Sequence, residues 1–187
     1  PERIRSDNGV PFASRARGGL SRVSIWWVRL GIVPERIAPG KPQQNGRHER
    51  MHRTLKQAAT RPPATSQRAQ QRRFNAFCRE YNHQRPHEAL DQQTPASQYT
   101  PSTRPYPRRL PELHYPDYYE VRKVSRNGVV YWRNTMIYVS HLLAQERVGL
   151  DAIDDGIWQV YFGPLLLGRF DERKVKGNSV PYITLTV

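Results

Sequence analysis

The stretch Pro42-Gln43-Gln44-Asn45-Gly46-Arg47-His48-Glu49-Arg50 governs the interpretation of the first half of this chain. Pro42 suits the first turn of a helix, and Met51 and Leu55 continue the stretch at helical spacing. We therefore predict a helix over residues 43–59 that buries these apolar residues. Glu49 lies near the start of that helix.

Residues three, four and seven positions after Glu49 share its face of the predicted helix. These residues are His52, Arg53 and Lys56, so a carboxylate stands beside a cationic stripe. Arg53 is also placed to neutralise Glu49 at a distance of one helical turn. An ordinary surface ion pair, worth about 0.3–0.5 kcal/mol, explains the pattern equally well, so helix geometry alone leaves both interpretations open.

A second carboxylate, Asp7, stands in Arg5-Ser6-Asp7-Asn8-Gly9, and 41 residues separate it from Glu49. Residues 3–6 are predicted to form the end of a strand, and Asn8-Gly9 is a turn signal. Carboxylates that converge from a strand end and a helix can hold a pair of divalent cations during phosphodiester attack. Because Mg²⁺ takes few protein carboxylates and leaves positions for phosphate and water, we predict Asp7 and Glu49 as its ligands.

The same helix also contains a zinc-type pattern. His48-Glu49-Arg50-Met51-His52 fits H-E-x-x-H, in which two histidines one turn apart bind zinc and the Glu is a general base. This alternative predicts a metalloprotease. A pattern that fixes three positions arises easily by chance, and the basic surroundings suit a nucleic-acid substrate better.

The charge of the chain indicates a polyanionic partner. Its formal net charge is +14 and its pI is about 10.5, which favours DNA, RNA or an anionic membrane surface. Residues 1–90 carry 18 Lys/Arg against 6 Asp/Glu, whereas residues 91–187 carry 12 against 10. No apolar run approaches the roughly 18 residues that a membrane span requires, and no signal peptide is apparent. We expect a cytoplasmic protein without membrane contact that binds polyanions mainly through its first half.

Two further helices are expected in the first half, over residues 18–30 and 67–81. Trp27 belongs to the apolar stripe of the first helix, and Trp26 lies at the edge of that stripe. The single cysteine, Cys78, stands at core spacing on the second helix, so we expect it to be buried. One cysteine excludes an internal disulfide and a thiolate zinc cluster.

The second half has a different texture. Residues 94–116 hold six of the sixteen prolines, which predicts a semi-rigid linker. Short β-branched and aromatic runs follow, separated by turns, with a tight-hairpin signal at Asn127-Gly128. Five or six such strands predict a small β-barrel over residues 117–187. Its first hairpin carries basic residues that either contact a nucleic-acid backbone or are only solvated, among them Arg122, Lys123 and Arg126.

Three ordered motifs resemble those of the integrase catalytic core. Ser6-Asp7-Asn8-Gly9 with Phe12 resembles its second-carboxylate strand, and Pro42-x-x-Asn45-Gly46-x-x-Glu49-Arg50 with Leu55-Lys56 resembles its third-carboxylate helix. Tyr81-Asn82-x-x-Arg85-Pro86-His87-x-x-Leu90, followed by Thr94-Pro95, is similar to the end of that core. The resemblance covers residues 1–99 and indicates the DDE-type transposases of bacterial insertion sequences, relatives of retroviral integrases.

The resemblance implies an α/β chain: the C-terminal part of an RNase H-like core over residues 1–93, the linker over 94–116 and an SH3-like β-barrel over 117–187. It implies a two-metal site with Mg²⁺ or Mn²⁺, nicking at transposon ends and joining of the freed 3′-hydroxyl to target DNA. Asp7 and Glu49 match two of the three catalytic acids. The residues expected on DNA are Asn45, Arg53 and Lys56. A homo-oligomer of the intact form and a nucleoid-associated location are also implied.

The chain departs from the family pattern in two ways. The family's usual interval between these acids is shorter than the 41 residues found here. The first acid has no counterpart before Asp7, so we expect an incomplete core that lacks catalysis on its own. The alternative is a non-catalytic DNA-binding remnant, or an inhibitor of the intact transposase. A general RNA-binding protein would rest on charge alone.

Overall fold

The computed structural model describes residues 1–133, 135–174 and 182–184. Within these residues the fold is mixed α/β, with three α-helices and with nine strands in three sheets. The sequence therefore predicted the fold class correctly at this level.

The chain divides into two compact units. The first unit combines residues 1–39 with residues 106–187, and the second consists of residues 40–105. The domain boundaries that we predicted, at residues 93 and 117, follow a different division of the chain and stay a prediction.

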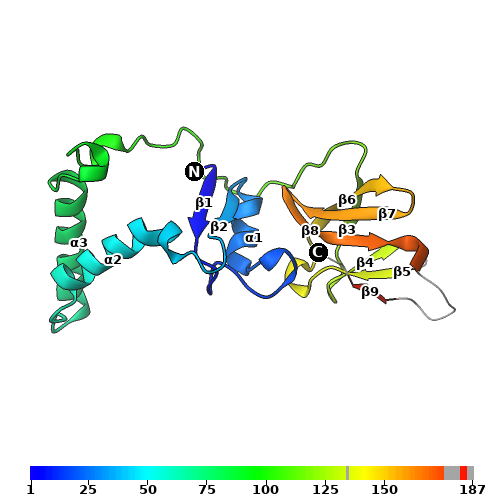
Figure 1. The fold of residues 1–187 in the computed structure, drawn as a ribbon, viewed down its shortest axis with the longest axis horizontal. Coiled ribbons are helices and arrows are strands. Elements are labelled where there is room, and N and C mark those ends of the chain that lie inside the picture. The colour runs from blue at the N-terminus through cyan, green and yellow to red at the C-terminus, as the bar shows by residue number, and fades with distance from the viewer. Residues whose placement is uncertain (134, 175–181, 185–187) are drawn as a thin grey trace. The chain divides into compact units, whose positions relative to one another are not determined.

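The first unit begins with a two-stranded parallel sheet. β1 (Arg3–Ser6) pairs with β2 (Val33–Arg36), and α1 (Arg22–Arg29) connects them (Figure 1). Such a crossover is required because parallel strands cannot be joined by a tight hairpin. The strand predicted before Asp7 is thereby confirmed.

Helix α1 is shorter than the helix predicted over residues 18–30. Ser21 and Ser24 form a capping box: Ser21 Oγ accepts from the Ser24 backbone N–H at 3.1 Å, and Ser24 Oγ accepts from the Ser21 N–H at 2.8 Å. This cap satisfies two N–H groups and makes Arg22 the first helical residue. As predicted, Trp27 is buried, whereas Trp26 is 42% exposed.

Two further sheets form the β region of the first unit. One sheet has the order β3-β6-β7-β8 and contains β3 (Glu120–Lys123), β6 (Arg147–Asp154), β7 (Ile157–Phe162) and β8 (Leu165–Asp171). The other has the order β4-β5-β9 and contains β4 (Val129–Trp132), β5 (Thr135–Tyr138) and β9 (Tyr182–Thr184). The five or six short strands that we predicted after residue 117 are confirmed by β3 to β8, which lie between residues 120 and 171.

One hydrophobic core joins α1 to the β region. Ile25 and Val28 of α1 belong to the same buried cluster as Val160 and Phe162 of β7. Full burial of a side chain of this size contributes roughly 1.5–3 kcal/mol. Residues 1–39 and the β region are therefore stabilised by each other, although the whole second unit lies between them in the sequence.

The hairpin predicted at Asn127-Gly128 is wrong. The turn itself forms, with Gly128 at a φ of 77° and its N–H donating to Ser125 O at 3.0 Å. However, β3 before the turn pairs with β6, and β4 after it pairs with β5. The Gly128 carbonyl accepts from the N–H groups of Val139 and Ser140, so the turn packs against that segment and not between two paired strands.

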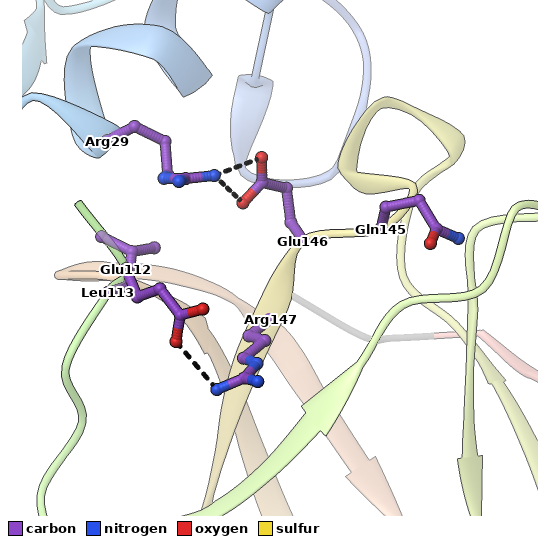
Figure 2. Close-up of a pocket in the computed structure, with 6 residues that line it drawn as sticks. All are labelled: Arg29, Glu112, Leu113, Gln145, Glu146 and Arg147. Atoms are coloured by element: carbon purple, nitrogen blue, oxygen red, sulfur yellow. Dashed lines mark hydrogen bonds and ion pairs between the residues drawn. The ribbon is translucent and has the colours of Figure 1, made fainter. Parts of the chain in front are cut away.

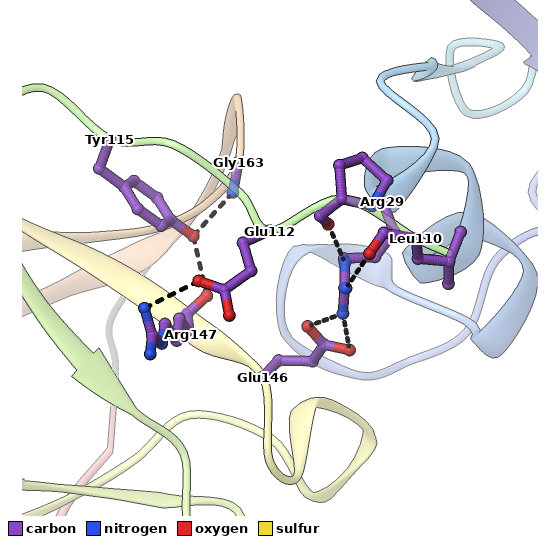
Figure 3. Close-up of polar contacts among 8 residues, drawn as sticks. Arg29, Leu110, Glu112, Tyr115, Glu146, Arg147 and Gly163 are labelled. Atoms are coloured by element: carbon purple, nitrogen blue, oxygen red, sulfur yellow. Dashed lines mark hydrogen bonds and ion pairs between the residues drawn. The ribbon is translucent and has the colours of Figure 1, made fainter. Parts of the chain in front are cut away.

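Arg29, near the end of α1, connects three segments of the first unit. Its Nη1 donates to both carboxylate oxygens of Glu146, at 2.8 and 2.7 Å (Figure 2). Its Nε donates to Pro111 O at 3.0 Å, and its Nη2 donates to Leu110 O at 3.3 Å (Figure 3). One guanidinium thus joins α1, the residues that lead into the β region, and the start of β6.

Arg29 and Glu146 also line a pocket of about 240 Å³ (Figure 2). Its other lining residues are Glu112, Leu113, Gln145 and Arg147. Arg147 forms an ion pair with Glu112 at 3.0 Å, and Arg29 forms one with Glu146. Because the charges are paired within the pocket, we assign it a structural role.

Tyr115 makes a second connection, from the residues that lead into the β region to β6 and to the turn between β7 and β8. Its hydroxyl donates to Arg147 O at 2.8 Å and accepts from the Gly163 N–H at 3.1 Å (Figure 3). Burial raises the pKa of this phenol above its usual value. Gly149 leaves room for the ring, since a Cβ there would lie 2.5 Å from Tyr115 Cδ1.

The second unit contains α2 (Gly46–Ala59) and α3 (Gln67–His83), which pack against each other (Figure 1). A single 3-10 turn, Pro42–Asn45, precedes α2, so Asn45-Gly46 marks the helix start. The helices predicted over residues 43–59 and 67–81 are confirmed with these adjusted ends.

The predicted burial of Cys78 on α3 is wrong, because this side chain is exposed. Ala59 and Phe77 are the buried apolar residues of α2 and α3. Two helices cover only a narrow stripe on each other, and Cys78 lies beyond the edge of that stripe. Core spacing in the sequence therefore overestimated how much of α3 is covered. None of the described helices is long and apolar enough to cross a membrane.

We predict that Arg29→Ala lowers the free energy of unfolding of the first unit by about 1–2 kcal/mol, because it removes charge-assisted bonds and leaves Glu146 without its partner. Both side chains of this pair are only about one-fifth exposed, at 20% and 23%. All four tryptophans lie in the first unit, so urea unfolding followed by Trp fluorescence measures its stability. Arg147→Ala is the control: its pair with Glu112 is 57% and 70% exposed, and we expect a loss of about 0.5 kcal/mol or less. Equal losses for both variants would contradict the anchoring role of Arg29.

A second prediction concerns pH. Tyr115→Phe should cost about 1 kcal/mol at neutral pH, because two backbone groups lose their hydroxyl partner. The folded-state pKa of Tyr115 is raised, so the stability that it contributes is complete below the unfolded pKa of about 10 and falls as pH rises through the folded pKa. The difference between wild type and variant should therefore shrink above pH ~10 in the same unfolding assay. A difference that stays constant to higher pH would contradict this assignment.

Candidate functional site

Asp7 follows β1 at the end where the parallel strands finish. Its Oδ1 accepts from the Gly9 N–H at 2.9 Å, and the neighbouring Asn8 Nδ2 donates to Ile37 O at 3.0 Å, just beyond β2. The first bond fixes the side chain of Asp7, and the second ties its loop to the adjacent strand. The Asp7 side chain is exposed. Its carboxylate is therefore accessible to a ligand that binds where the parallel strands end.

Glu49 lies in the first turn of α2, where the partial positive charge of the helix N-terminus favours an anion. Its side chain is exposed. The ordinary ion pair between Glu49 and Arg53, which helix geometry left open, is not formed among the described residues, and Glu49 has no side-chain hydrogen bond there. Both the carboxylate and the guanidinium are therefore available to other groups.

The solvent-facing side of α2 is cationic. Arg50, Arg53 and Lys56 are exposed. Arg50 lies on the side of the helix opposite the buried Ala59, whereas Lys56 lies one turn before Ala59, at the edge of the buried side. On α3, the side opposite Phe77 carries a second row of exposed cations: Arg68, Arg72 and Arg79. Among the described residues no Lys or Arg of either helix takes part in an ion pair.

Asn45 is the residue before α2, and its side chain forms no cap on the helix. It is partly exposed beside Gly46, at the entry to the helix that bears Glu49. Its amide is therefore not occupied in holding the helix start, and a role toward a ligand stays a prediction.

The predicted contacts of the β region are less uniform. Arg122 forms an ion pair with Glu120 at 2.7 Å, and its guanidinium lies 5.3 Å from the ring centre of Trp132. Its charge is thus partly used within the fold. Lys123 and Arg126 are exposed, near the turn after β3. These three residues stay candidates for contact with a nucleic-acid backbone.

The zinc alternative gains no support from the geometry. The rings of His48 and His52 pack against each other, with centres 4.2 Å apart. Across the described parts of the chain, no group of three or more His, Cys, Asp or Glu side chains is placed to hold a metal ion. Asp7 belongs to the first unit and Glu49 to the second, so their pairing stays a prediction.

Sequence reasoning missed a pocket of about 450 Å³ in the second unit, which we call the Tyr81 pocket. Its lining residues are Arg47, Arg50, Tyr81, His87, Ala89, Leu90 and Pro95. The signal was present in the sequence, because these residues come from two of the three motifs. We had treated the motif around Tyr81 only as the end of a domain, and its contact with the start of α2 required the fold.

A comparison with protein families agrees with the motifs. Residues 30–95 match the family model described as integrase core domain. The matched range contains Asn45, Glu49, Arg53 and Lys56, together with the whole Tyr81 pocket, whereas Asp7 lies before it. The resemblance to integrase and transposase catalytic cores is thereby confirmed for residues 30–95, which are similar to the integrase core domain.

Proposed function

We propose that this chain is part of a DDE-type transposase that carries out metal-dependent DNA strand transfer. The observation that carries the proposal is the place of Glu49, an accessible carboxylate on the cationic face of α2 inside the integrase core segment. In this proposal residues 1–93 belong to an RNase H-like core, and residues 117–187 form an SH3-like barrel. The parallel β1–β2 pair with its α1 crossover, and the shared core of the β region, support these two assignments.

Asp7 and Glu49 supply oxygen donors of the kind that Mg²⁺ or Mn²⁺ prefers, and both carboxylates are exposed and free of ion pairs among the described residues. When bound, the metal would activate the attacking hydroxyl and stabilise the leaving oxygen. Arg53 and Lys56 hold the phosphate backbone against the face that bears Glu49. Asn45 contacts DNA at the entry to α2.

The reaction exchanges one phosphodiester for another. The 3′-hydroxyl oxygen of the transposon end forms a bond to a target phosphorus, and the bond from that phosphorus to its original 3′ oxygen breaks. The proton of the attacking hydroxyl leaves to solvent, and the departing oxygen takes one up. Positioning and charge stabilisation are the main contributions that a protein makes to phosphoryl transfer of this kind.

A second candidate function is DNA binding without catalysis, as a remnant or as an inhibitor that forms mixed oligomers with an intact transposase. The cations of α2 and α3 favour it, because they are sufficient for DNA affinity whether or not the carboxylates hold metal. A cytoplasmic protein associated with the nucleoid fits either candidate.

The first test is strand transfer with Mn²⁺ on a model transposon end. We expected the incomplete core to lack catalysis on its own, so metal-dependent joining by this chain would contradict that expectation. Where joining is measured, it should fall by at least about a hundred-fold in Asp7→Asn and in Glu49→Gln, since even outer-shell changes around metal ligands cost about 10–100-fold. Glu80→Gln removes another exposed carboxylate, on α3, and should leave joining unchanged. Salt-sensitive DNA binding without joining would establish the second candidate. Joining that survives Glu49→Gln would overturn the role of Glu49.

The second test measures how DNA affinity depends on salt. Each phosphate contact contributes roughly 0.9 to the slope of log K against log salt for duplex DNA. Replacing both Arg53 and Lys56 by Ala should therefore lower that slope by about 2, measured by fluorescence anisotropy on a duplex of random sequence. Arg173→Ala is a matched control, because Arg173 is paired with Asp171 at 2.9 Å and should leave the slope unchanged. A slope that is the same in the double variant would remove these residues from the DNA-binding surface.

A further inference from the structure

The Tyr81 pocket lies between the first turns of α2 and the residues that follow α3. Its volume of about 450 Å³ falls within the range of about 300–1,000 Å³ that is typical of small-molecule sites. Arg47 and Arg50 line it from α2, on either side of Glu49 in the sequence. The pocket therefore lies within one turn of the proposed catalytic carboxylate along the same helix, on a different side of that helix.

The apolar part of the pocket is held in place by ring contacts. The Tyr81 ring lies 5.3 Å from the Phe77 ring and 4.7 Å from the His87 ring, measured between ring centres. The Arg85 guanidinium lies 5.9 Å from the centre of the Tyr81 ring. Of these groups Tyr81 and His87 line the pocket, and with Leu90 they form a wall that is mostly aromatic and aliphatic. Flat apolar walls of this kind suit nucleobases of any sequence.

His87 provides a polar group within this wall. Its Nε2 is buried and has no hydrogen-bond partner among the described residues. The backbone around it is fixed, since the His87 N–H donates to Gln93 O at 3.1 Å and the Gln92 N–H donates to His87 O at 3.0 Å. Buried polar atoms are nearly always bonded to protein groups, ordered water or a ligand, so this ring nitrogen is open to a further partner.

The two arginines give the pocket a charged end. Arg47 and Arg50 are exposed, and neither pairs with an acid among the described residues. Two guanidinium groups present paired N–H donors that match phosphate oxygens. A ligand that fits has an anionic phosphate at one end and a flat ring with hydrogen-bonding edges at the other.

We propose that the Tyr81 pocket binds one unpaired nucleotide of the DNA strand that runs past Glu49. The base lies against Tyr81 and Leu90 and bonds to His87 Nε2, and its phosphate contacts Arg47 and Arg50. This proposal rests on the proposed function, because it makes DNA the ligand. It adds that the bound DNA is unpaired at this point, so the enzyme should distinguish frayed or overhanging ends from blunt ones.

The test compares a blunt duplex with the same duplex carrying a one-nucleotide overhang, measured by fluorescence anisotropy with the full chain. Stacking of one base leads us to expect roughly five- to one-hundred-fold tighter binding of the overhang. Ala89→Trp fills the pocket from an exposed position, and it should reduce this ratio to about one. The double variant Arg47→Ala/Arg50→Ala should reduce it as well. Arg61→Ala, an exposed arginine outside the pocket, should keep the full ratio.

A second measurement does not depend on variants. An overhang that carries 5-iodouracil should crosslink, on irradiation, to the peptide that contains residues 81–90. Three results would each overturn the proposal. The wild type could bind both duplexes equally, Ala89→Trp could keep the preference for the overhang, or the crosslinks could be confined to other peptides. The two proposals fail separately. Joining without a preference for the overhang would reject only the role proposed for the pocket. A preference for the overhang without joining would reject only the proposed catalysis.

Discussion

The guanidinium of Arg29 is the interaction on which the first unit depends. Its N–H donors have a fixed planar arrangement. They make four hydrogen bonds to three residues: one to Pro111 O, one to Leu110 O and two to the carboxylate of Glu146. A lysine at this position has one ammonium on a flexible stem and could not make all four of these bonds. Because α1 connects β1 to β2, fixing α1 on the β region also fixes the sheet that carries Asp7.

The two units use their cations in different ways. In the first unit several arginines are paired within the fold, as Arg29 is with Glu146 and Arg133 is with Glu172. In the second unit 12 Lys/Arg face 4 Asp/Glu, and those of α2 and α3 are free of ion pairs among the described residues. Unpaired like charges repel one another, and a bound polyanion relieves that repulsion. The surplus of charge therefore points to the helices that carry Glu49.

Local patterns in the sequence predicted the elements well, and failed where partners distant in the chain decide the outcome. Periodicity and caps located α2, α3 and the strands β3 to β8, because these signals are contained within each segment. The hairpin at Asn127-Gly128 was wrong because a turn sequence fixes a local bend and does not select the strand that pairs beyond it. Cys78 was wrong because burial depends on how much of α3 its neighbour covers.

The same distinction applies to the candidate site. The motif around Glu49 could be interpreted from the sequence, since its cationic neighbours follow from helix geometry alone. The Tyr81 pocket could not, because it requires the start of α2 to meet residues 81–95. The sequence supplied both motifs, and only the fold brings them together around a buried ring nitrogen without a partner.

In the proposed complex, Glu49 and the DNA phosphate carry the same sign of charge, so their approach has to be offset. Two unit charges 4 Å apart interact by about 4 kcal/mol near a protein surface. The helix N-terminus offsets only about 0.3–1 kcal/mol of such a repulsion, so Arg53, Lys56 and a divalent cation must supply the rest. The cations act whether or not metal is bound, whereas the carboxylate can assist the chemistry only through the metal. DNA affinity therefore depends on the cations of this helix face, and joining depends in addition on Glu49, so joining can be removed while DNA affinity is retained.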